Sequence, residues 1–257
     1  MLKIENVEVV GWEPAIRGMR NPMNSWEKSD SLFIPEQFCD EDYTWELAKV
    51  CGGVAPYIKE NDHRLMMSLA KGGPVHAKYR RMIMVYADIT APLYWWKEFD
   101  TYKVGTVANS CSTMHKIHAK EFTLDDFSHD HLMSDRHECW EEDVMTGPEC
   151  IDTPMDILEH IVDALNLYRA KYLEAKTKSM KEEAKRAGLM KKYWWQMIQL
   201  LPSSYNQKRT VMMPYEVLAN IYPSRRHHKL DEWHVVCDWI ETLPYAELII
   251  AKPEVDE

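Results

Sequence analysis

The segment Met82–Thr90 reads MIMVYADIT, and the aromatic run LYWWKEF (93–99) follows it after Ala91 and Pro92. Met82–Thr90 is short, nearly all apolar and contains β-branched residues, which is typical of a strand that is buried on both faces. Pro92 favours a helix start, because the missing N–H of proline costs no hydrogen bond in the first turn of a helix. The segment therefore predicts a buried strand that leads directly into an aromatic helix.

Helical patterns flank this strand on both sides. Upstream, they predict helices over Asp42–Cys51 and Asn61–Lys71, the second with Asn61 and Asp62 as its cap. Downstream, the predicted helices are a long one from Thr153 to about Gly188, then Lys191–Leu200, Pro214–Tyr222 and Leu230–Leu243. Thr101–Ser112 is predicted to be a polar loop. We expect an α/β (α+β) single domain, helix-rich with a modest central sheet, and a variable acidic, histidine-rich insertion around 121–150.

The composition excludes several classes of protein. The chain has 257 residues, of which 46% are apolar and 28% charged, as in an ordinary globular protein. A formal charge of −10 disfavours a general nucleic-acid surface, since phosphate backbones bind clustered lysine and arginine. The N-terminal sequence MLKIENVEVVGWEP differs from a signal peptide, and no stretch approaches the roughly 18 uninterrupted apolar residues of a membrane span. We therefore expect a cytoplasmic protein that binds neither nucleic acid nor membrane.

The six cysteines show no C-x-x-C pair and no short, regular spacing. They are Cys39, Cys51, Cys111, Cys139, Cys150 and Cys237. A chain of this length does not need disulfide bonds for stability, so reduced thiols are expected.

Three stretches in a fixed order resemble the flavin-dependent thymidylate synthases. The first is Asn61–Lys71 (NDHRLMMSLAK), followed by His76, the apolar strand and Ala91-Pro92. Members of that family have a D-R/H-H/R-L-type helix, a G-H turn, a strand, and A-P before an aromatic helix. His76 stands where the family places a histidine that contacts flavin.

The second stretch, Thr101–His115, resembles the family signature R-H-R-x-x-S-x-N-E-x-S-x-R-Y in a degraded form. With one inserted residue, Asn109 and Ser112 match the signature. Four positions are substituted: Lys103 for its last basic residue, Thr106 for its first serine, Ser110 for its glutamate and Met114 for its arginine. The loop thus keeps short hydrogen-bonding residues and loses three strong charges.

The third stretch is C-terminal and begins with Leu201-Pro202, which matches an L-P pair of the family. Asn220 lies near the position of an asparagine that binds flavin. Arg225 and Arg226 precede Trp233 by eight and seven residues, which is the spacing of the family's substrate arginine before a tryptophan.

The resemblance implies a reductive methylation in which reduced FAD supplies hydride, methylenetetrahydrofolate supplies carbon, and dUMP becomes dTMP. NADPH is the implied reductant, and the implied assembly is a homotetramer whose active sites are shared between subunits. The implied cofactor-binding residues are His76, Lys103, Thr106, Asn109 and Asn220. The implied substrate-binding residues are Ser110, Ser112, Arg225 and Arg226. The two arginines are the catalytic candidates, because a guanidinium fits the uracil carbonyl edge and stabilises negative charge as the ring is activated.

Two other functions stay open. The lost loop arginines favour a flavin-dependent enzyme that acts on another pyrimidine nucleotide. So do Ser110 in place of the signature glutamate, and Glu232 and His234 in place of the family's glutamine and glutamate on either side of the tryptophan. A relative that binds a nucleotide or a partner without turnover is the non-enzymatic alternative.

A metal site is the competing interpretation of a different segment. Six possible ligands lie within 25 residues: His115, His118, His129, His131, His137 and Cys139. Their spacing matches no standard zinc site, so we expect no metal.

Overall fold

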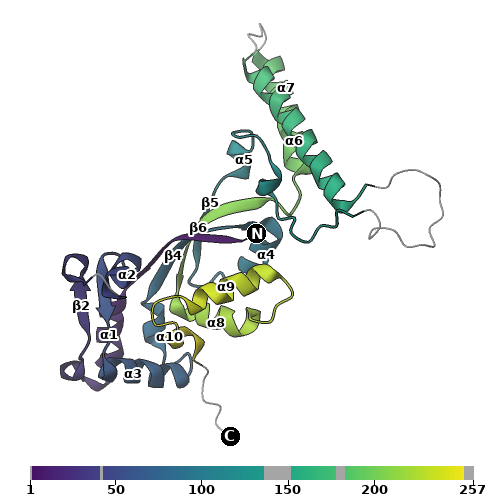
Figure 1. Cartoon of the computed structure of the whole chain (residues 1–257). Coiled ribbons are helices and arrows are strands. Elements are labelled where there is room, and N and C mark those ends of the chain that lie inside the picture. The colour runs from purple at the N-terminus through teal and green to yellow at the C-terminus, as the bar shows by residue number, and fades with distance from the viewer. Residues whose placement is uncertain (1, 41–42, 136–151, 178–182, 252–257) are drawn as a thin grey trace, which may run out of the picture. The chain divides into compact units, whose positions relative to one another are not determined.

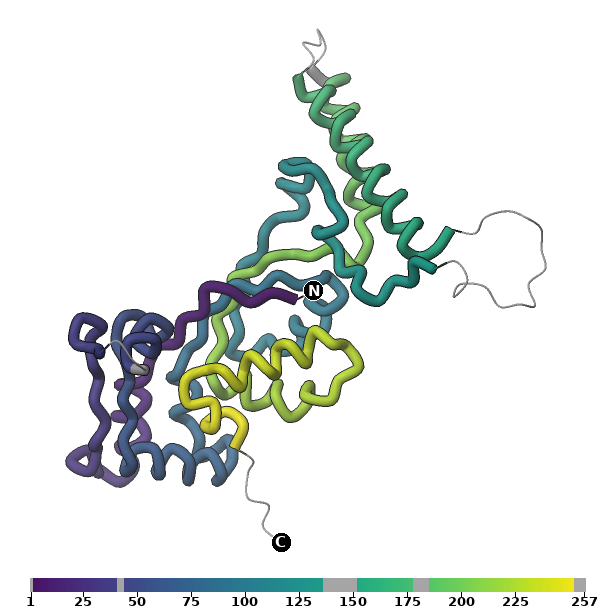
Figure 2. The backbone as a smooth tube through the Cα atoms, viewed as in Figure 1, coloured from purple at the N-terminus to yellow at the C-terminus, as the bar shows by residue number. Residues whose placement is uncertain are grey.

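The computed structural model describes residues 2–40, 43–135, 152–177 and 183–251. The main sheet has four strands in the order β1-β4-β6-β5 (Figure 1). Their bounds are Lys3–Val10 for β1, Met84–Pro92 for β4, Asn206–Pro214 for β6 and Val107–Ser110 for β5. Strands that are distant in sequence are therefore neighbours in this sheet, as the chain trace also shows (Figure 2). The predicted fold class, helix-rich with a modest sheet, is confirmed.

A second, smaller sheet joins β2 (Leu32–Pro35) to β3 (Val54–Tyr57) in antiparallel fashion. In the main sheet, β1 also runs antiparallel to β4, with Lys3 opposite Thr90 and Val10 opposite Met84. The register shifts between Glu5 and Glu8, where Asn6 has a positive φ of 51°. This irregularity is a bulge in β1.

β4 is the strand that the sequence predicts, but only one of its faces is buried. Val85, Ala87 and Ile89 are buried, whereas Tyr86 is exposed. The prediction of burial on both faces is wrong, because an antiparallel sheet can leave its second face to solvent and side chains alternate between the faces.

The helices carry the rest of the described chain. Their bounds are Trp12–Arg20 (α1), Tyr43–Val50 (α2), Glu60–Lys71 (α3), Leu93–Phe99 (α4), Thr113–Lys116 (α5), Pro154–Thr177 (α6), Glu183–Leu200 (α7), Tyr215–Arg225 (α8), Asp231–Glu241 (α9) and Glu247–Ile250 (α10). Short 3₁₀ helices lie at Asn21–Met23 (η1), Trp26–Lys28 (η2), Glu36–Phe38 (η3), Lys78–Arg81 (η4) and Leu124–Asp126 (η5). Among the described residues, no helix is both long enough and apolar enough to cross a membrane.

The described chain divides into two compact units. The larger unit comprises Leu2–Thr90, Lys97–Asn109 and the chain from Arg209 onward, and the smaller unit comprises Ala91–Trp96 and Ser110–Lys208. The single domain expected from the sequence stays a prediction.

The smaller unit is built on α6 and α7, which run side by side (Figure 1). Its core consists of apolar side chains from these helices and from the segment before them: Ile117, Phe122, Phe127, Leu158, Val162, Leu165 and Met197. α6 begins as predicted, because Thr153 Oγ1 accepts the Asp156 N–H at 3.1 Å and Asp156 Oδ2 accepts the Thr153 N–H at 2.9 Å. The predicted continuous helix to Gly188 is wrong, since α6 ends at Thr177 and Gly188 lies within α7.

The acidic, histidine-rich segment around 121–150 is described only up to Asp135. Its first part contains η5, which Thr123 and Asp126 cap reciprocally. Residues 136–150 lie outside the described residues, so the insertion stays a prediction.

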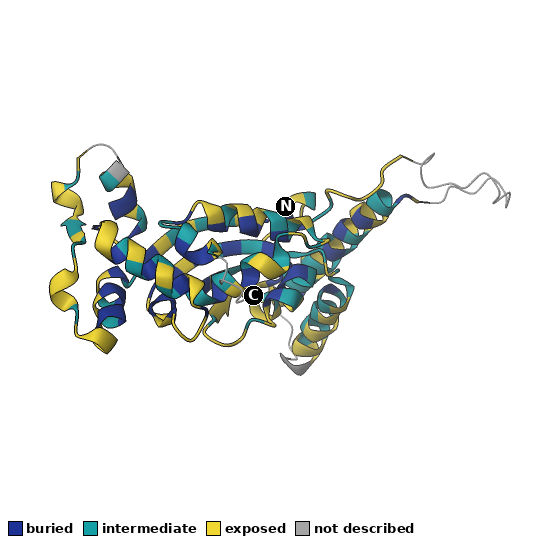
Figure 3. Cartoon of the chain, turned by 90° about the horizontal axis from the view of Figure 1, so that it is seen from below, coloured by how far each residue is buried: buried dark blue, intermediate teal, exposed yellow. Residues whose placement is uncertain are grey.

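The core of the larger unit is rich in aromatic side chains. Trp12, Tyr79, Tyr215 and Trp233 are each at most 4% exposed. The rings of Trp12 and Tyr215 meet edge to face with 5.4 Å between their centroids. Buried positions recur at helical spacing, as colouring by burial shows (Figure 3). The predicted inner face of α9 is confirmed, since Trp233, Val236 and Ile240 are all buried.

Asp62, near the start of α3, is a buried acceptor rather than a helix cap. It is 0% exposed, and its Oδ1 accepts a hydrogen bond from Arg20 Nε at 2.7 Å. Four donors reach its Oδ2: Ser29 Oγ at 2.8 Å, the Asp30 N–H at 3.0 Å, the Ser31 N–H at 3.0 Å and Ser31 Oγ at 2.7 Å. The predicted cap of Asn61 and Asp62 is wrong, because Asp30 accepts the N–H groups of both residues, at 3.0 and 3.1 Å.

α1 begins directly after Gly11, whose φ is 95°. A Cβ atom at this position would lie 2.0 Å from the carbonyl oxygen of Met82, so a side chain does not fit without a shift of the backbone. Gly11 therefore permits the close approach of the start of α1 to the chain just before β4.

The four described cysteines, Cys39, Cys51, Cys111 and Cys237, are free thiols. Burial raises the pKa of Cys51 to about 12 and that of Cys237 to about 11, so both stay protonated at neutral pH. Cys139 and Cys150 lie outside the described residues.

Candidate functional site

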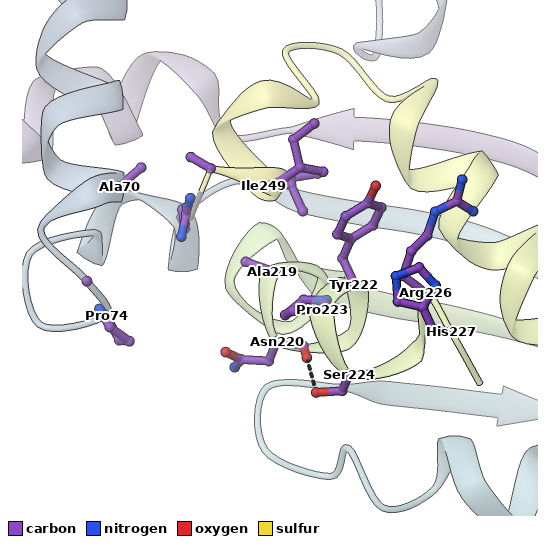
Figure 4. A pocket seen from close by; sticks show the side chains of 14 residues that line it. Ala70, Pro74, Ala219, Asn220, Tyr222, Pro223, Ser224, Arg226, His227 and Ile249 are labelled. Carbon is purple, nitrogen blue, oxygen red and sulfur yellow. Dashed lines mark hydrogen bonds between the residues drawn. The ribbon is translucent and has the colours of Figure 1, made fainter. Parts of the chain in front are cut away.

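A cavity of about 780 Å³ lies in the larger unit, beside the C-terminal half of α8 (Figure 4). Its apolar walls include Ala219, Pro223, Ile249 and Ile250. Polar side chains also line it, namely Arg80, Asn220, Ser224, Arg226 and His227. The volume is typical of small-molecule sites, which measure roughly 300–1,000 Å³.

α8 supplies several of the polar groups, and Pro223 interrupts its backbone hydrogen bonding. Proline has no N–H, so Pro223 does not donate to the carbonyl of Ala219 one turn earlier. Ser224 Oγ donates to the carbonyl of Asn220 at 3.0 Å (Figure 4). The last turn of α8 therefore offers both backbone and side-chain polar groups to a ligand in the cavity.

Arg80 brings a buried positive charge to the cavity wall. The residue is only 7% exposed, and its Nε and Nη2 have no hydrogen-bond partner among the described residues. The neighbouring Tyr79 hydroxyl donates to the Met66 carbonyl at 2.9 Å, and burial raises the pKa of Tyr79 to about 12. Tyr79 is therefore neutral at physiological pH and does not balance the charge of Arg80.

Arg225, one of the two predicted catalytic residues, belongs to a mostly buried cluster. Its Nη1 donates to Glu98 Oε2 at 2.8 Å and its Nε to the Tyr102 hydroxyl at 2.9 Å. The Trp233 indole N–H donates to the same Glu98 oxygen at 3.0 Å, and His228 Nε2 lies 3.3 Å from it. The guanidinium carbon lies 4.7 Å from the centroid of the Trp233 ring. These five residues form the Glu98 cluster, and Arg225 is not among the residues that line the cavity.

Arg226, the second predicted catalytic residue, lines the cavity. Its Nη1 donates to Asp238 Oδ1 at 2.6 Å, and its Nη2 lies 3.5 Å from Glu241 Oε1. Its side chain remains 35% exposed. The two adjacent arginines thus have different environments, and of the two Arg226 is the one that faces the cavity.

The first and third stretches of the resemblance meet at this cavity. Asn220 lines it, and so do Gly73 and Pro74 in the turn that precedes His76. His76 itself is exposed and is not a lining residue. Its ring packs near Gly72, where an added Cβ would lie 3.3 Å from the His76 side chain.

The predicted polar loop Thr101–Ser112 contains β5, which is an edge strand of the main sheet beside β6. The prediction of a continuous loop is wrong there, because backbone pairing with β6 makes a strand of Val107–Ser110 although its side chains show no apolar alternation. All four residues of β5 are exposed, and they include Asn109 and Ser110.

The remaining residues of this loop lie outside the cavity wall. Lys103 is exposed, while Thr106 Oγ1 is buried without a hydrogen-bond partner in the described chain. Ser112 Oγ accepts the His115 N–H at 3.1 Å and thereby caps α5. Within one chain, the structure therefore brings Asn220 and Arg226 to the cavity but none of the predicted loop residues.

No family model and no curated protein matches this sequence. Among solved structures, two of the flavin-dependent thymidylate synthase of Helicobacter pylori with FAD and dUMP are similar. One is 15% identical with a TM-score of 0.52 and covers 95% of this chain and 96% of that chain. The other is 14% identical with a TM-score of 0.55 and covers 97% and 100%. The chain has the fold of the flavin-dependent thymidylate synthases.

A UMP/dUMP methylase from Streptomyces cacaoi, bound with 5-Br dUMP, is similar as well. It is 12% identical with a TM-score of 0.52, and the match covers 100% of this chain and 98% of that chain. The similarity in fold to these three structures thus extends over nearly the full length of the present chain.

The histidines of the competing metal site are dispersed within this fold. The His118 ring packs against Tyr172 in a tilted arrangement with 4.5 Å between ring centroids, and burial lowers the pKa of His118. His129 Nδ1 lies 2.9 Å from the Phe127 carbonyl oxygen. In the part of the chain that is described, no group of three potential ligands is placed to hold a metal. His137 and Cys139 lie outside that part.

Sequence reasoning missed Arg80 as a site residue. The run KYRR (78–81) precedes the apolar strand, and two adjacent arginines there look like a solvated surface pair. A burial signal was present in Tyr79, whose large ring indicates that one face of this turn packs inward.

Proposed function

We propose that this chain is a flavin-dependent enzyme that reductively methylates dUMP to dTMP, with FAD as cofactor, methylenetetrahydrofolate as carbon donor and NADPH as reductant. The main support is the fold match, which covers at least 95% of each chain compared and includes proteins bound to FAD, dUMP and 5-Br dUMP. An enzyme that uses these soluble substrates would work in the cytoplasm.

The chemistry of the cavity fits a nucleotide-like group. Asn220 and Ser224 provide hydrogen-bonding side chains, and Arg80 and Arg226 provide positive charge. Ile249 and its apolar neighbours would exclude water, which strengthens each of these polar contacts. FAD, when bound, would supply the hydride chemistry, and the residues of the chain would hold and orient the reacting groups.

We further propose a homotetramer with shared active sites. Lys103, Asn109 and Ser110 are exposed in the single chain and do not line its cavity. An edge strand such as β5 has backbone groups that are free to meet another surface. In the tetramer, the predicted loop residues, with Thr106 and Ser112, would contribute to a site together with residues of another copy, and His76 would contact flavin.

A second function has a specific observation in its favour. Arg225 lies at the spacing of the family's substrate arginine, yet Glu98 and Tyr102 already take up its Nη1 and Nε. A substrate whose base differs from uracil would not need Arg225 to bind its carbonyl edge, which would explain why this arginine is engaged elsewhere. The fold also matches a UMP/dUMP methylase. The same flavin chemistry on another pyrimidine nucleotide is therefore the second candidate, and binding without turnover is the non-enzymatic one.

The purified protein is expected to bind FAD with a dissociation constant of about 10 μM or lower, or roughly −7 kcal/mol. Quenching of flavin fluorescence during titration measures this binding. Turnover is then measured as methylated product from dUMP, UMP or dCMP in the presence of methylenetetrahydrofolate and NADPH.

Asn220→Ala should weaken FAD binding, because Asn220 lines the cavity, whereas the exposed Lys229→Ala should leave it unchanged. Absence of FAD binding would reject both flavin-dependent functions. Tight binding without turnover of any pyrimidine nucleotide would favour the non-catalytic relative.

Arg226→Ala is expected to weaken pyrimidine nucleotide binding about tenfold, because a charge-assisted contact in the cavity is lost. Arg225→Ala should instead lower the unfolding temperature, since it removes a cation from the Glu98 cluster. Calorimetric titration at fixed salt with saturating FAD, and thermal unfolding, separate the two effects.

Lys229→Ala is the matched control, because Lys229 is an exposed cation of the same basic run. The assignment of this site is wrong if Arg226→Ala binds every nucleotide as tightly as the wild type.

A further inference from the structure

Two of the three guanidinium nitrogens of the buried cation Arg80, Nε and Nη2, have no hydrogen-bond partner within the described chain. The residue is 7% exposed, and both of these atoms are buried. Buried charges in folded proteins are normally paired, because removal from water is expensive unless an opposite charge compensates for it. Because Arg80 lines the cavity, a ligand in the cavity is the candidate for the missing partner.

The two free atoms have a geometry that selects the partner. Nε–H and Nη2–H point in parallel from one edge of the planar guanidinium, so they match two oxygens of a carboxylate or a phosphate. The adjacent Arg81 shows the contrast, because its Nε already donates to Glu216 Oε2 at 2.6 Å and its side chain is 53% exposed. Arg80 therefore has a vacant bidentate edge, whereas Arg81 does not.

The other cavity groups favour phosphate over carboxylate. The Arg80 edge reaches both oxygens of a carboxylate, whereas the phosphate of a nucleoside monophosphate has a third free oxygen and the diphosphate of FAD has a second phosphate, and these need further donors. Arg226 and Asn220 line the same cavity and carry such donors. The cavity volume of about 780 Å³ leaves room for a nucleoside attached to the phosphate, and the side chain of Ile249 offers it an apolar contact.

We propose that Arg80 binds a phosphate group of a nucleotide ligand in this cavity, through a bidentate contact from Nε and Nη2. The phosphate belongs either to the pyrimidine nucleotide or to FAD, and the identity of the molecule that carries it rests on the proposed function. Arg80 lies outside the loop Thr101–Ser112, in which Lys103 is the only charged residue. The phosphate contact thus comes from η4 rather than from that loop.

Calorimetric titrations of the wild type, Arg80→Met and Arg81→Met test this proposal. The ligands are two pairs, dUMP with deoxyuridine and FAD with riboflavin, together with pyrophosphate and succinate. Arg80→Met is expected to weaken binding of the phosphate-bearing member of one pair by about ten- to a hundredfold and to leave its phosphate-free member unchanged. The affected pair identifies the source of the phosphate, and Arg81→Met should bind all ligands like the wild type.

Thermal unfolding gives a readout that a merely structural arginine would not produce. Without ligand, Arg80→Met should unfold at the same or a higher temperature than the wild type, because an uncompensated buried charge is replaced by an apolar side chain of similar length. Pyrophosphate should raise the unfolding temperature of the wild type and of Arg81→Met but not that of Arg80→Met.

Three results would overturn the proposal. The first is equal affinity of wild type and Arg80→Met for every phosphate-bearing ligand. The second is Arg80-dependent binding of succinate without binding of phosphates. The third is phosphate binding that appears only in a chain ending at Ala251, since the residues removed include Glu254 and Asp256, whose carboxylates would then be the partner.

The outcome also separates this proposal from the proposed function. Arg80-dependent binding of pyrophosphate in a protein that binds neither FAD nor a pyrimidine nucleotide supports the phosphate site and rejects the flavin-dependent enzyme. If Arg80→Met leaves both FAD binding and turnover unchanged, the proposed enzyme is supported and the phosphate site at Arg80 is rejected.

Discussion

Asp62→Ala is expected to lower the free energy of unfolding by about 3–5 kcal/mol, the cost of breaking a buried ion pair by removing one partner. Arg20 and Asp62 are 4% and 0% exposed, so water does not replace the lost contact. The substitution also leaves the donors from Ser29, Asp30 and Ser31 without their common acceptor. Urea unfolding followed by circular dichroism measures the loss.

Glu60→Gln is the control for this experiment, because Glu60 lies in the same helix and is exposed. Removal of its charge should cost less than about 1 kcal/mol, through its interaction with the helix dipole. If Asp62→Ala costs no more than Glu60→Gln, the buried network does not stabilise the fold in the way described above.

The same network makes stability depend on pH. Burial raises the pKa of Asp62, but hydrogen bonds from Ser31, Arg20 and Ser29 together outweigh burial and hold that pKa below its usual 3.8. Because the folded pKa is below the unfolded one, the contribution of Asp62 is fully present above the unfolded pKa and is lost as pH falls through the folded pKa. The stability difference between the wild type and Asp62→Asn should therefore shrink as the pH falls below about 4.

Glu98→Ala is expected to cost about 2–3 kcal/mol of folding free energy. Glu98 Oε2 is the shared acceptor for the Arg225 guanidinium and the Trp233 indole N–H, and Trp233 is 0% exposed. Without Glu98, one cation and one buried donor lose their acceptor together. Glu98→Gln keeps an oxygen acceptor and should fall between the wild type and Glu98→Ala.

Lys97→Ala provides the matched control, since Lys97 is the exposed neighbour of Glu98 in α4. It should change stability by less than about 0.5 kcal/mol. Equal stabilities of Glu98→Ala and Lys97→Ala would show that the Glu98 cluster contributes nothing measurable.

Sequence patterns predicted the elements that are determined by interactions between residues close together in the sequence. α9 follows from apolar residues at helical spacing, and the start of α6 follows from the reciprocal cap of Thr153 and Asp156. β5 was missed because the paired strand, rather than the side chains of Val107–Ser110, determines its conformation.

Interactions between distant residues were not predictable in this way. Arg20 and Asp62 are 42 residues apart, and Glu98 and Arg225 are 127 apart, so no local pattern links either pair. Charged residues are exposed by default, and only the fold shows which of them are buried.

The candidate site shows the same limit at the level of single residues. The sequence placed Asn220 and Arg226 among the site residues, and both line the cavity. It did not distinguish Arg80 from Arg81, because adjacent residues of one chemical type differ only in the direction that η4 gives their side chains.

The close backbone approach at Gly11 restricts how this part of the chain can evolve. Every missense change of a glycine codon adds at least a Cβ atom, and here that atom would lie 2.0 Å from the Met82 carbonyl oxygen. A positive φ of 95° adds backbone strain for any residue with a side chain. Position 11 therefore has no neutral substitution, and genetic drift can alter the residues around it but not the glycine itself.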